Sequence, residues 1–132
     1  MSLSRRSLMA LTAGALLAAC SRKEAPQTTR TDLNPGETPE LRKMIKNSAA
    51  EHQIPESLLH RVIQRESGYN PGARNGPYYG LMQIMPQTAQ TMGYQGAPEG
   101  LLDPETNLRY AGRYLRGAWL VAEGDPDAAM GW

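Results

Sequence analysis

Apolar side chains recur every three or four residues along several stretches of the chain, a spacing that predicts amphipathic helices. The first stretch begins at Thr38 and Pro39, a capping hydroxyl followed by a proline that suits the first helical turn, and continues to His52. The second opens at Pro55 and is expected to end at Gly68, because glycine readily takes the left-handed conformation found after a helix. Its apolar face carries Leu58, Leu59, Val62 and Ile63.

Proline and glycine interrupt the helical spacing after residue 68. Residues 69–80 hold two prolines and three glycines, which favours a loop over regular structure. Pro86 is expected to begin a short helix that runs to Met92, and residues 94–102 form a second irregular link. The glycine-rich loop is long enough to line a cleft between the helices.

The longest helix is predicted to start at Asp103, where a capping carboxylate precedes Pro104. Gly124 should end it, and Asp125 then begins one more short helix. The apolar face of the long helix consists of Leu108, Ala111, Leu115, Trp119 and Ala122. No segment sustains the alternation of apolar and polar residues typical of strands, so the expected fold class is mainly α.

Glu66 lies four residues after Val62 and therefore shares the apolar stripe of the second helix. Apolar surroundings disfavour the charged form of a carboxyl group, which can then donate a proton near neutral pH. Glu66 is therefore a candidate general acid. The pattern also fits an ordinary glutamate at a helix end, paired with Arg61 or Arg65 or capped by Ser67, and helical spacing does not separate the two interpretations.

The remaining polar and aromatic residues indicate no cofactor. Tyr69, Tyr78 and Tyr79 suit stacking on sugar rings, and they suit equally well the role of lids on a core. His52 and His60 lie apart from acids or cysteine at metal-ligand spacing and are interpreted as helix-surface residues. The sequence has no phosphate-cradling glycine motif and no serine nucleophile motif, so neither a metal nor another cofactor is expected.

The N-terminus has the pattern of an export signal. Arg5 and Arg6 precede an apolar run over residues 8–19, which is too short to span a bilayer but suits the core of a secretory signal. Small residues just before Cys20 resemble the lipobox of bacterial lipoproteins, in which the cysteine is acylated and becomes the first mature residue. Cys20 is therefore the predicted lipidation site and membrane anchor, with a buried free thiol or a simple signal peptide as the alternatives.

The same segment bears on the export route and the destination. Adjacent arginines resemble a twin-arginine signal but also occur in ordinary secretory signals, so the sequence leaves both routes open. Ser21 after the cysteine resembles the residue that sorts lipoproteins of Gram-negative bacteria to the outer membrane. The predicted location is the periplasmic face of that membrane.

Charge and composition divide the rest of the chain. Removal of residues 1–19 leaves 113 residues with 12 basic and 13 acidic side chains. A domain so close to neutral lacks the clustered basic surface that nucleic-acid binding requires. Residues 20–37, rich in Thr, Pro, Gln and charge, are expected to form a flexible tether. Residues 38–132 are left for one small domain, expected to be monomeric.

Three motifs occur in order along this domain. They read VIQRESGYNPGA at residues 62–73, YGLMQIMPQTA at 79–89 and LLDPETNLRYAGRYLRG at 101–117. Together they resemble the lytic transglycosylase family with an SLT-type domain, which has a lysozyme-like helical fold. The resemblance implies cleavage of the β-1,4 bond between N-acetylmuramic acid and N-acetylglucosamine in the glycan strands of peptidoglycan.

The resemblance also implies a mechanism and a set of site residues. Glu66 matches the family's single catalytic acid, whereas most glycosidases use two carboxylates. In the family the substrate's N-acetyl oxygen stabilises the positive centre, and the deprotonated Glu then acts as a base on the C6 hydroxyl, closing a 1,6-anhydro ring. Asn75 stands where the family often has a serine. The residues matched to substrate binding are Ser67, Asn75, Gly80, Gln83 and Met85.

One departure from the family concerns the C-terminal end. In the family a further helix follows the long one and bears a tyrosine near the catalytic Glu, whereas this chain stops at Trp132. A truncated C-terminal helix is therefore expected, with the core face of residues 108–122 exposed. The alternative functions are a non-catalytic peptidoglycan-binding lipoprotein, with a truncated or degenerate domain, and a small helical lipoprotein that scaffolds an envelope assembly.

Overall fold

Capping side chains set the starts of three helices. Thr38 Oγ1 accepts a hydrogen bond from the N–H of Leu41 at 3.1 Å, at the start of α1 (Pro39–His52). Asp103 caps α4 (Pro104–Val121) by accepting from the N–H of Thr106 at 2.9 Å, and Asp125 caps α5 (Pro126–Ala129). A proline occupies the first turn of each helix, where no N–H is needed, so all three predicted starts are confirmed.

Two further helices carry the middle of the chain. α2 (Glu56–Ser67) ends at Gly68, whose φ of 56° is left-handed and whose N–H donates to the carbonyl of Gln64 at 3.3 Å. The stop predicted at Gly68 is therefore confirmed. α3 (Pro86–Thr91) begins at the predicted proline and ends one residue earlier than expected.

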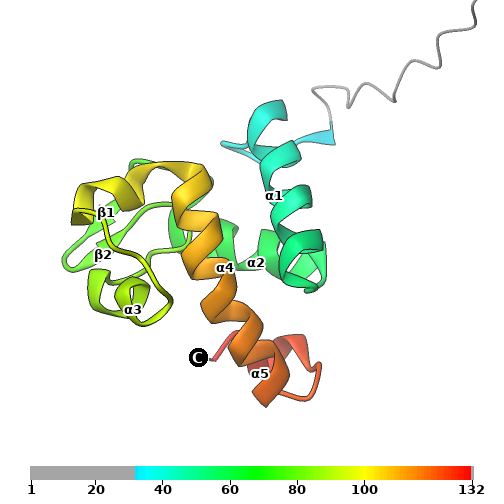
Figure 1. Ribbon diagram of the computed structural model, residues 1–132. Helices are drawn as coiled ribbons and strands as arrows, with labels where there is room; N and C mark the ends of the chain where they lie inside the picture. The colour runs from blue at the N-terminus through cyan, green and yellow to red at the C-terminus, as the bar shows by residue number, and fades with distance from the viewer. Residues whose placement is uncertain (1–31, 132) are drawn as a thin grey trace, which may run out of the picture.

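The computed structural model describes residues 32–131, and α4 lies at their centre (Figure 1). α1 packs along one side of α4, and α3 and the 3-10 helix η2 (Pro98–Leu102) pack on the opposite side. α5 folds back on the C-terminal part of α4. α2 packs against α1. The arrangement is mainly helical, which confirms the predicted fold class.

The apolar faces predicted from helical spacing form the core. Trp119 of α4 and Ala122, which follows this helix, are partly buried against this core. The helical residues that fill it, each less than a tenth exposed, include Leu41 and Ile45 of α1, Leu58, Leu59, Val62 and Ile63 of α2, and Leu108, Ala111 and Leu115 of α4.

The prediction that residues 108–122 expose their core face is wrong. Leu108, Ala111, Leu115 and Ala118 are at most 6% exposed, because α1, α3, η2 and α5 all pack on α4. The exposed apolar residues of this helix are Tyr114, Leu120 and Val121, which lie off that face. Ala129 of α5 is itself 2% exposed and belongs to the core.

Both histidines also depart from their predicted surface positions. His52 Nε2 lies 3.1 Å from the carbonyl oxygen of Leu108, between α1 and α4. His60 Nδ1 lies 2.9 Å from the hydroxyl of Tyr69, a residue that is only 2% exposed. The two rings are half-buried and help to join neighbouring elements.

The segment between α2 and α3 contains regular structure that the sequence did not predict. β1 (Arg74–Asn75) and β2 (Tyr78–Tyr79) pair antiparallel, with Arg74 opposite Tyr79. After the hairpin, the N–H of Gly80 donates to the carbonyl of Ala73 at 2.8 Å. Strands of two residues are too short to show an alternating pattern.

Residues 32–37, the entry segment, pack on the domain although they were assigned to the tether. A Cβ added at Gly36 would lie 2.5 Å from the carbonyl oxygen of Gly68, so this part of the backbone lies directly against the end of α2. The domain therefore begins before residue 38. The predicted tether over residues 20–31, the signal segment and Cys20 lie outside the described residues. Within residues 32–131, none of the helices has the length and apolar character needed to cross a bilayer.

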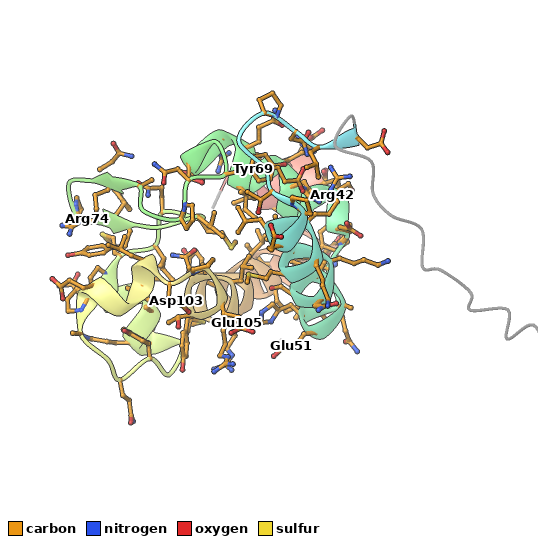
Figure 2. The ribbon with its side chains drawn as sticks, turned by 90° about the horizontal axis from the view of Figure 1, so that it is seen from above. Arg42, Glu51, Tyr69, Arg74, Asp103 and Glu105 are labelled. Atoms are coloured by element: carbon orange, nitrogen blue, oxygen red, sulfur yellow. The ribbon has the colours of Figure 1, made fainter. Side chains whose placement is uncertain are left out.

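Glu37 fixes the entry segment. Its side chain is fully buried. Its oxygens accept hydrogen bonds from Arg42 Nε at 2.9 Å and from Arg42 Nη2 at 2.7 Å (Arg42 is labelled in Figure 2). They also accept from the backbone N–H and the Nδ2 of Asn34, both at 2.9 Å. Burial by itself raises the pKa of Glu37, but the hydrogen bonds from Arg42 and Asn34 outweigh it and hold the pKa at about 2, against an ordinary 4.5.

This pKa predicts acid sensitivity. Because the folded state lowers the pKa of Glu37, its contribution to stability is complete above about pH 4.5 and is lost as the pH falls toward 2. Glu37→Gln should lower the free energy of unfolding at pH 7 by about 3 kcal/mol. At pH 3 the loss should be about half of that or less.

Urea unfolding of Glu37→Gln and the unsubstituted chain at both pH values measures these differences. The matched control is Glu40→Gln, an exposed acid in the first turn of α1, which should change little at either pH. A loss for Glu37→Gln that is the same at pH 7 and pH 3 would contradict the assignment.

Candidate active site

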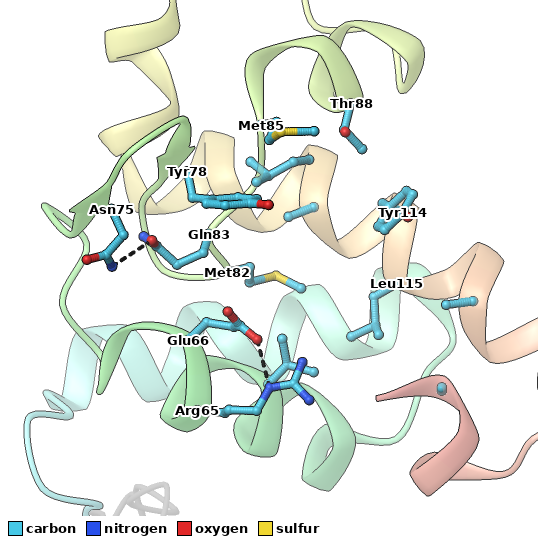
Figure 3. A pocket seen from close by; sticks show the side chains of 15 residues that line it. Arg65, Glu66, Asn75, Tyr78, Met82, Gln83, Met85, Thr88, Tyr114 and Leu115 are labelled. Carbon is cyan, nitrogen blue, oxygen red and sulfur yellow. Dashed lines mark hydrogen bonds and ion pairs between the residues drawn. The ribbon is translucent and has the colours of Figure 1, made fainter. Parts of the chain in front are cut away.

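A cleft of about 490 Å³ opens between the end of α2, the turn after β2, and the faces of α3, α4 and α5 (Figure 3). Two of its lining residues are charged, Arg65 and Glu66, both from the last turn of α2. The rest are apolar or neutral polar: Val62, Asn75, Tyr78, Met82, Gln83, Ile84, Met85, Thr88, Ala111, Tyr114, Leu115, Ala118 and Ala129.

Glu66 points into the cleft below Tyr78 and Gln83 (Figure 3). Although Glu66 shares the apolar stripe of α2, 29% of its side chain remains exposed. Glu66 Oε1 accepts a hydrogen bond from Arg65 Nε at 2.7 Å. The sequence left two alternatives for Glu66, an ion pair with an arginine and a position facing a cleft. The structure shows both.

Gln83 and Asn75 form the wall opposite Glu66. Gln83 has a left-handed φ of 51°, and its Nε2 donates to the carbonyls of Gly80 at 2.8 Å and Ala73 at 3.1 Å. Asn75 Nδ2 donates to Gln83 Oε1 at 2.9 Å. These bonds tie the hairpin to the turn that follows it, so both amides hold the wall in shape as well as facing the cleft.

Asn107 of α4 supports this wall from behind, and sequence analysis missed it. Its side chain is fully buried, and Oδ1 accepts from the N–H of Met82 at 2.9 Å. Nδ2 donates to the carbonyls of Tyr79 and Leu101, at 2.8 and 2.9 Å. One amide thus satisfies backbone groups of the turn and of η2 that would otherwise be buried without partners.

Ser67 and Gly80, predicted to bind substrate, lie behind the cleft surface. Ser67 Oγ donates to the carbonyl of Leu81 at 2.7 Å, which joins the end of α2 to the same turn. Gly80 is buried with a φ of 78°, and the space beside its Cα is filled by Asn107 and Leu101. The lack of a side chain at Gly80 thus permits a close approach of the protein's own chain.

The structure separates the tyrosines into two groups. Tyr69 and Tyr79 are 2% and 8% exposed and belong to the core. Tyr78 lines the cleft and is 44% exposed. Tyr114 of α4, which the sequence analysis did not single out, also lines it and is 42% exposed. Exposed aromatic rings on a concave surface suit stacking on the flat faces of sugars.

The methionines of the turn serve both the core and the cleft. Met82 and Ile84 are at most 8% exposed and pack in the core, and Met85 is half-buried at the start of α3. All three reach the cleft wall. Within residues 32–131 no cluster of three or more His, Cys, Asp or Glu side chains could hold a metal ion.

A family model described as the transglycosylase SLT domain matches residues 43–129, a span that contains α2, the hairpin, the turn and α4. The chain belongs to this family. The resemblance carried by the three sequence motifs is thereby confirmed, and the cleft of the SLT domain lies among the residues matched.

Curated relatives carry related names. Over 81 residues the SLT domain is 36% identical to the soluble lytic murein transglycosylase of Escherichia coli strain K12, covering 55% of this chain and 12% of that protein. Over 80 residues it is 35% identical to the membrane-bound lytic murein transglycosylase C of Yersinia pestis strain Pestoides F and of Serratia proteamaculans strain 568. That alignment covers 54% of this chain and 22% of each relative. The chain thus corresponds to less than a quarter of their length.

The packing of Gly80 predicts how the SLT domain responds to a single methyl group. In Gly80→Ala the new Cβ would lie 2.5 Å from the carbonyl oxygen of Leu101 and would also overlap Asn107. We expect a loss of about 3 kcal/mol in unfolding free energy, from left-handed strain and overpacking together. Thermal and urea denaturation measure it.

Gly76→Ala is the matched control for Gly80→Ala. Gly76 also has a left-handed φ, of 56°, but no atom lies within 4 Å of the added Cβ. This variant should lose only about 1 kcal/mol, from backbone strain alone. Equal losses in the two variants would show that the contact with Asn107 and Leu101 does not matter.

Proposed function

We propose that the SLT domain is a murein lytic transglycosylase that cleaves the β-1,4 bond between N-acetylmuramic acid and N-acetylglucosamine. The observation that carries the proposal is the position of Glu66: among the described residues that line the cleft, it is the only carboxylate. Glu66 lies within the matched segment, and the relatives named above are lytic murein transglycosylases. Peptidoglycan glycan strands are the proposed substrate.

A single carboxylate suits a reaction that needs no second acid. Protonated Glu66 donates its proton to the glycosidic oxygen as the bond to the muramic acid C1 breaks. The substrate's N-acetyl oxygen stabilises the positive charge that develops at C1. The Glu66 carboxylate then takes the proton of the C6 hydroxyl, whose oxygen bonds to C1 and forms the 1,6-anhydro ring. No water is consumed, and Glu66 ends in its starting protonation state.

The neutral lining of the cleft supports binding of an uncharged sugar backbone. Asn75 offers its amide on the wall opposite Glu66, where both N–H groups of the Gln83 amide are already bonded to the backbone, and Met85 lines the cleft at the start of α3. Tyr78 and Tyr114 offer exposed rings. Ser67 and Gly80 support the same wall through the turn that they brace.

We further propose that the protein is exported and attached to the membrane through a lipid on Cys20, with residues 20–31 as the tether. The export signal, the lipobox and the membrane-bound names of several relatives support this attachment. Ser21 supports sorting to the periplasmic face of the outer membrane. In this location a monomeric domain would reach the glycan strands of the wall.

Glu66→Gln tests the reaction directly. Digestion of purified sacculi by the full chain should release muropeptides with 1,6-anhydromuramic ends, and Glu66→Gln should lower this rate at least about a hundredfold. Mass spectrometry of the products distinguishes anhydro ends from the reducing ends that hydrolysis would leave.

The control is Glu56→Gln, the same substitution on the first turn of α2 and outside the cleft lining, which should retain activity. Binding to sacculi without any product from the unsubstituted chain would instead support the non-catalytic wall-binding function. Reducing ends as the main product would identify a hydrolase.

Cys20→Ala tests the anchor. When the full chain is expressed with a radioactive fatty acid, the unsubstituted protein should be labelled and sediment with the outer membrane, whereas Cys20→Ala should be unlabelled and leave the membrane fraction. Ser21→Ala, a neighbouring small-residue change that keeps the cysteine, should remain labelled. A labelled Cys20→Ala protein would exclude this attachment site.

A further inference from the structure

Arg65 joins the candidate catalytic residue to the C-terminal part of the domain. Its Nε donates to Glu66 Oε1 at 2.7 Å, and its Nη1 donates to the backbone carbonyl of Met130 at 2.8 Å. Met130 follows directly on α5. One guanidinium therefore contacts both the carboxylate in the cleft, as Figure 3 shows, and the residue that follows Ala129 of the cleft lining.

This contact is not what helical geometry alone would produce. Successive side chains on an α-helix point about 100° apart, so residues i and i+1 do not normally face each other. Arg65 reaches its neighbour because the guanidinium is also bonded to Met130, which directs it along the edge of the cleft. The planar, forked shape of arginine allows two such bonds at once, which a lysine ammonium does not match.

We propose that Arg65 is a positioning residue for Glu66, held in place by the backbone of Met130. The proposal rests on the transglycosylase function proposed above. When Glu66 donates its proton, negative charge develops on the carboxylate, and a guanidinium already bonded to Oε1 stabilises that charge without rearrangement. The same bond fixes the carboxylate's orientation toward the cleft.

Arg61, one helical turn earlier on α2, is a closely matched residue for comparison with Arg65. Arg61 also reaches α5, where its Nη2 donates to Asp127 Oδ1 at 2.8 Å. The side chains of Arg61 and Arg65 are almost equally exposed, 48% and 47%. Arg61 bonds to Asp127 and not to Glu66, and it does not line the cleft, so it links α2 to α5 without the second connection.

The test compares kcat and KM of full-chain variants on soluble, uncross-linked glycan strands of peptidoglycan, measured from the release of 1,6-anhydro ends. Arg65→Gln should lower kcat about tenfold and leave KM within about twofold, because the lost interaction acts in the transition state. Arg61→Gln should keep kcat within about twofold of the unsubstituted chain. Arg65→Lys should fall between them, since it restores charge but not the two-point contact.

Melting temperatures of the variants show whether a substitution has caused a general loss of structure. Arg61→Gln loses one exposed ion pair, and Arg65→Gln loses one exposed ion pair and one exposed hydrogen bond to a backbone carbonyl, so both should melt within a few degrees of the unsubstituted chain. Equal kcat values for Arg65→Gln and Arg61→Gln, or an Arg65→Gln defect confined to KM, would overturn the proposal. Glu66→Gln in the same assay separates the two questions, because full activity in that variant overturns the proposed function itself.

Discussion

The amide of Asn107 is the constraint on which the cleft depends. Three backbone groups, two from β2 and the turn after it and one from η2, meet at this one buried side chain, and each would be costly to leave unpaired in the interior. Gly80 is compatible with this arrangement because it has no Cβ and accepts a left-handed backbone. With the turn fixed to α4 by Asn107 and to α2 by Ser67, the wall that carries Gln83 lies at a set distance from the helix that carries Glu66.

The helices were predictable because their signals are local. Each capping residue and each following proline acts within one turn, and the apolar spacing within each helix selects the buried face. The hairpin, η2 and the entry segment were not predictable by these means. Their structure depends on contacts outside the spacing of a helix, such as Gly80 with Ala73 and Leu101 with Asn107, and on distant contacts such as that of Gly36 with Gly68 at the end of α2. Such contacts follow neither the period of a helix nor the alternation of a strand, so the spacing of apolar residues does not reveal them.

The candidate site shows the same division. Glu66, Asn75, Gln83 and Met85 line the cleft as the motifs suggested, because they lie in the segments that the family shares. Tyr114 was missed, since on helical spacing it reads as an ordinary exposed residue, and Arg65 was considered only as an ion-pair partner of Glu66. Asn107 did leave a trace: it precedes Leu108 and lies four residues before Ala111, so a polar residue stands on the buried side of α4. A polar residue at a core position indicates that its side chain forms hydrogen bonds with backbone groups, but it does not identify those groups.

Two carboxylate–arginine pairs in this domain have different roles because their surroundings differ. Glu37 accepts four hydrogen bonds from Arg42 and Asn34 with its side chain fully buried, which uses the acceptor capacity of a carboxylate and holds the group ionised. Glu66 accepts from Arg65 at one oxygen and is 29% exposed to the cleft, so acceptor positions remain for a ligand. The first pair stabilises the entry segment and can do little else. The second can exchange a proton with a bound molecule while its arginine keeps the carboxylate in place, and that difference makes Glu66 the better candidate for chemistry.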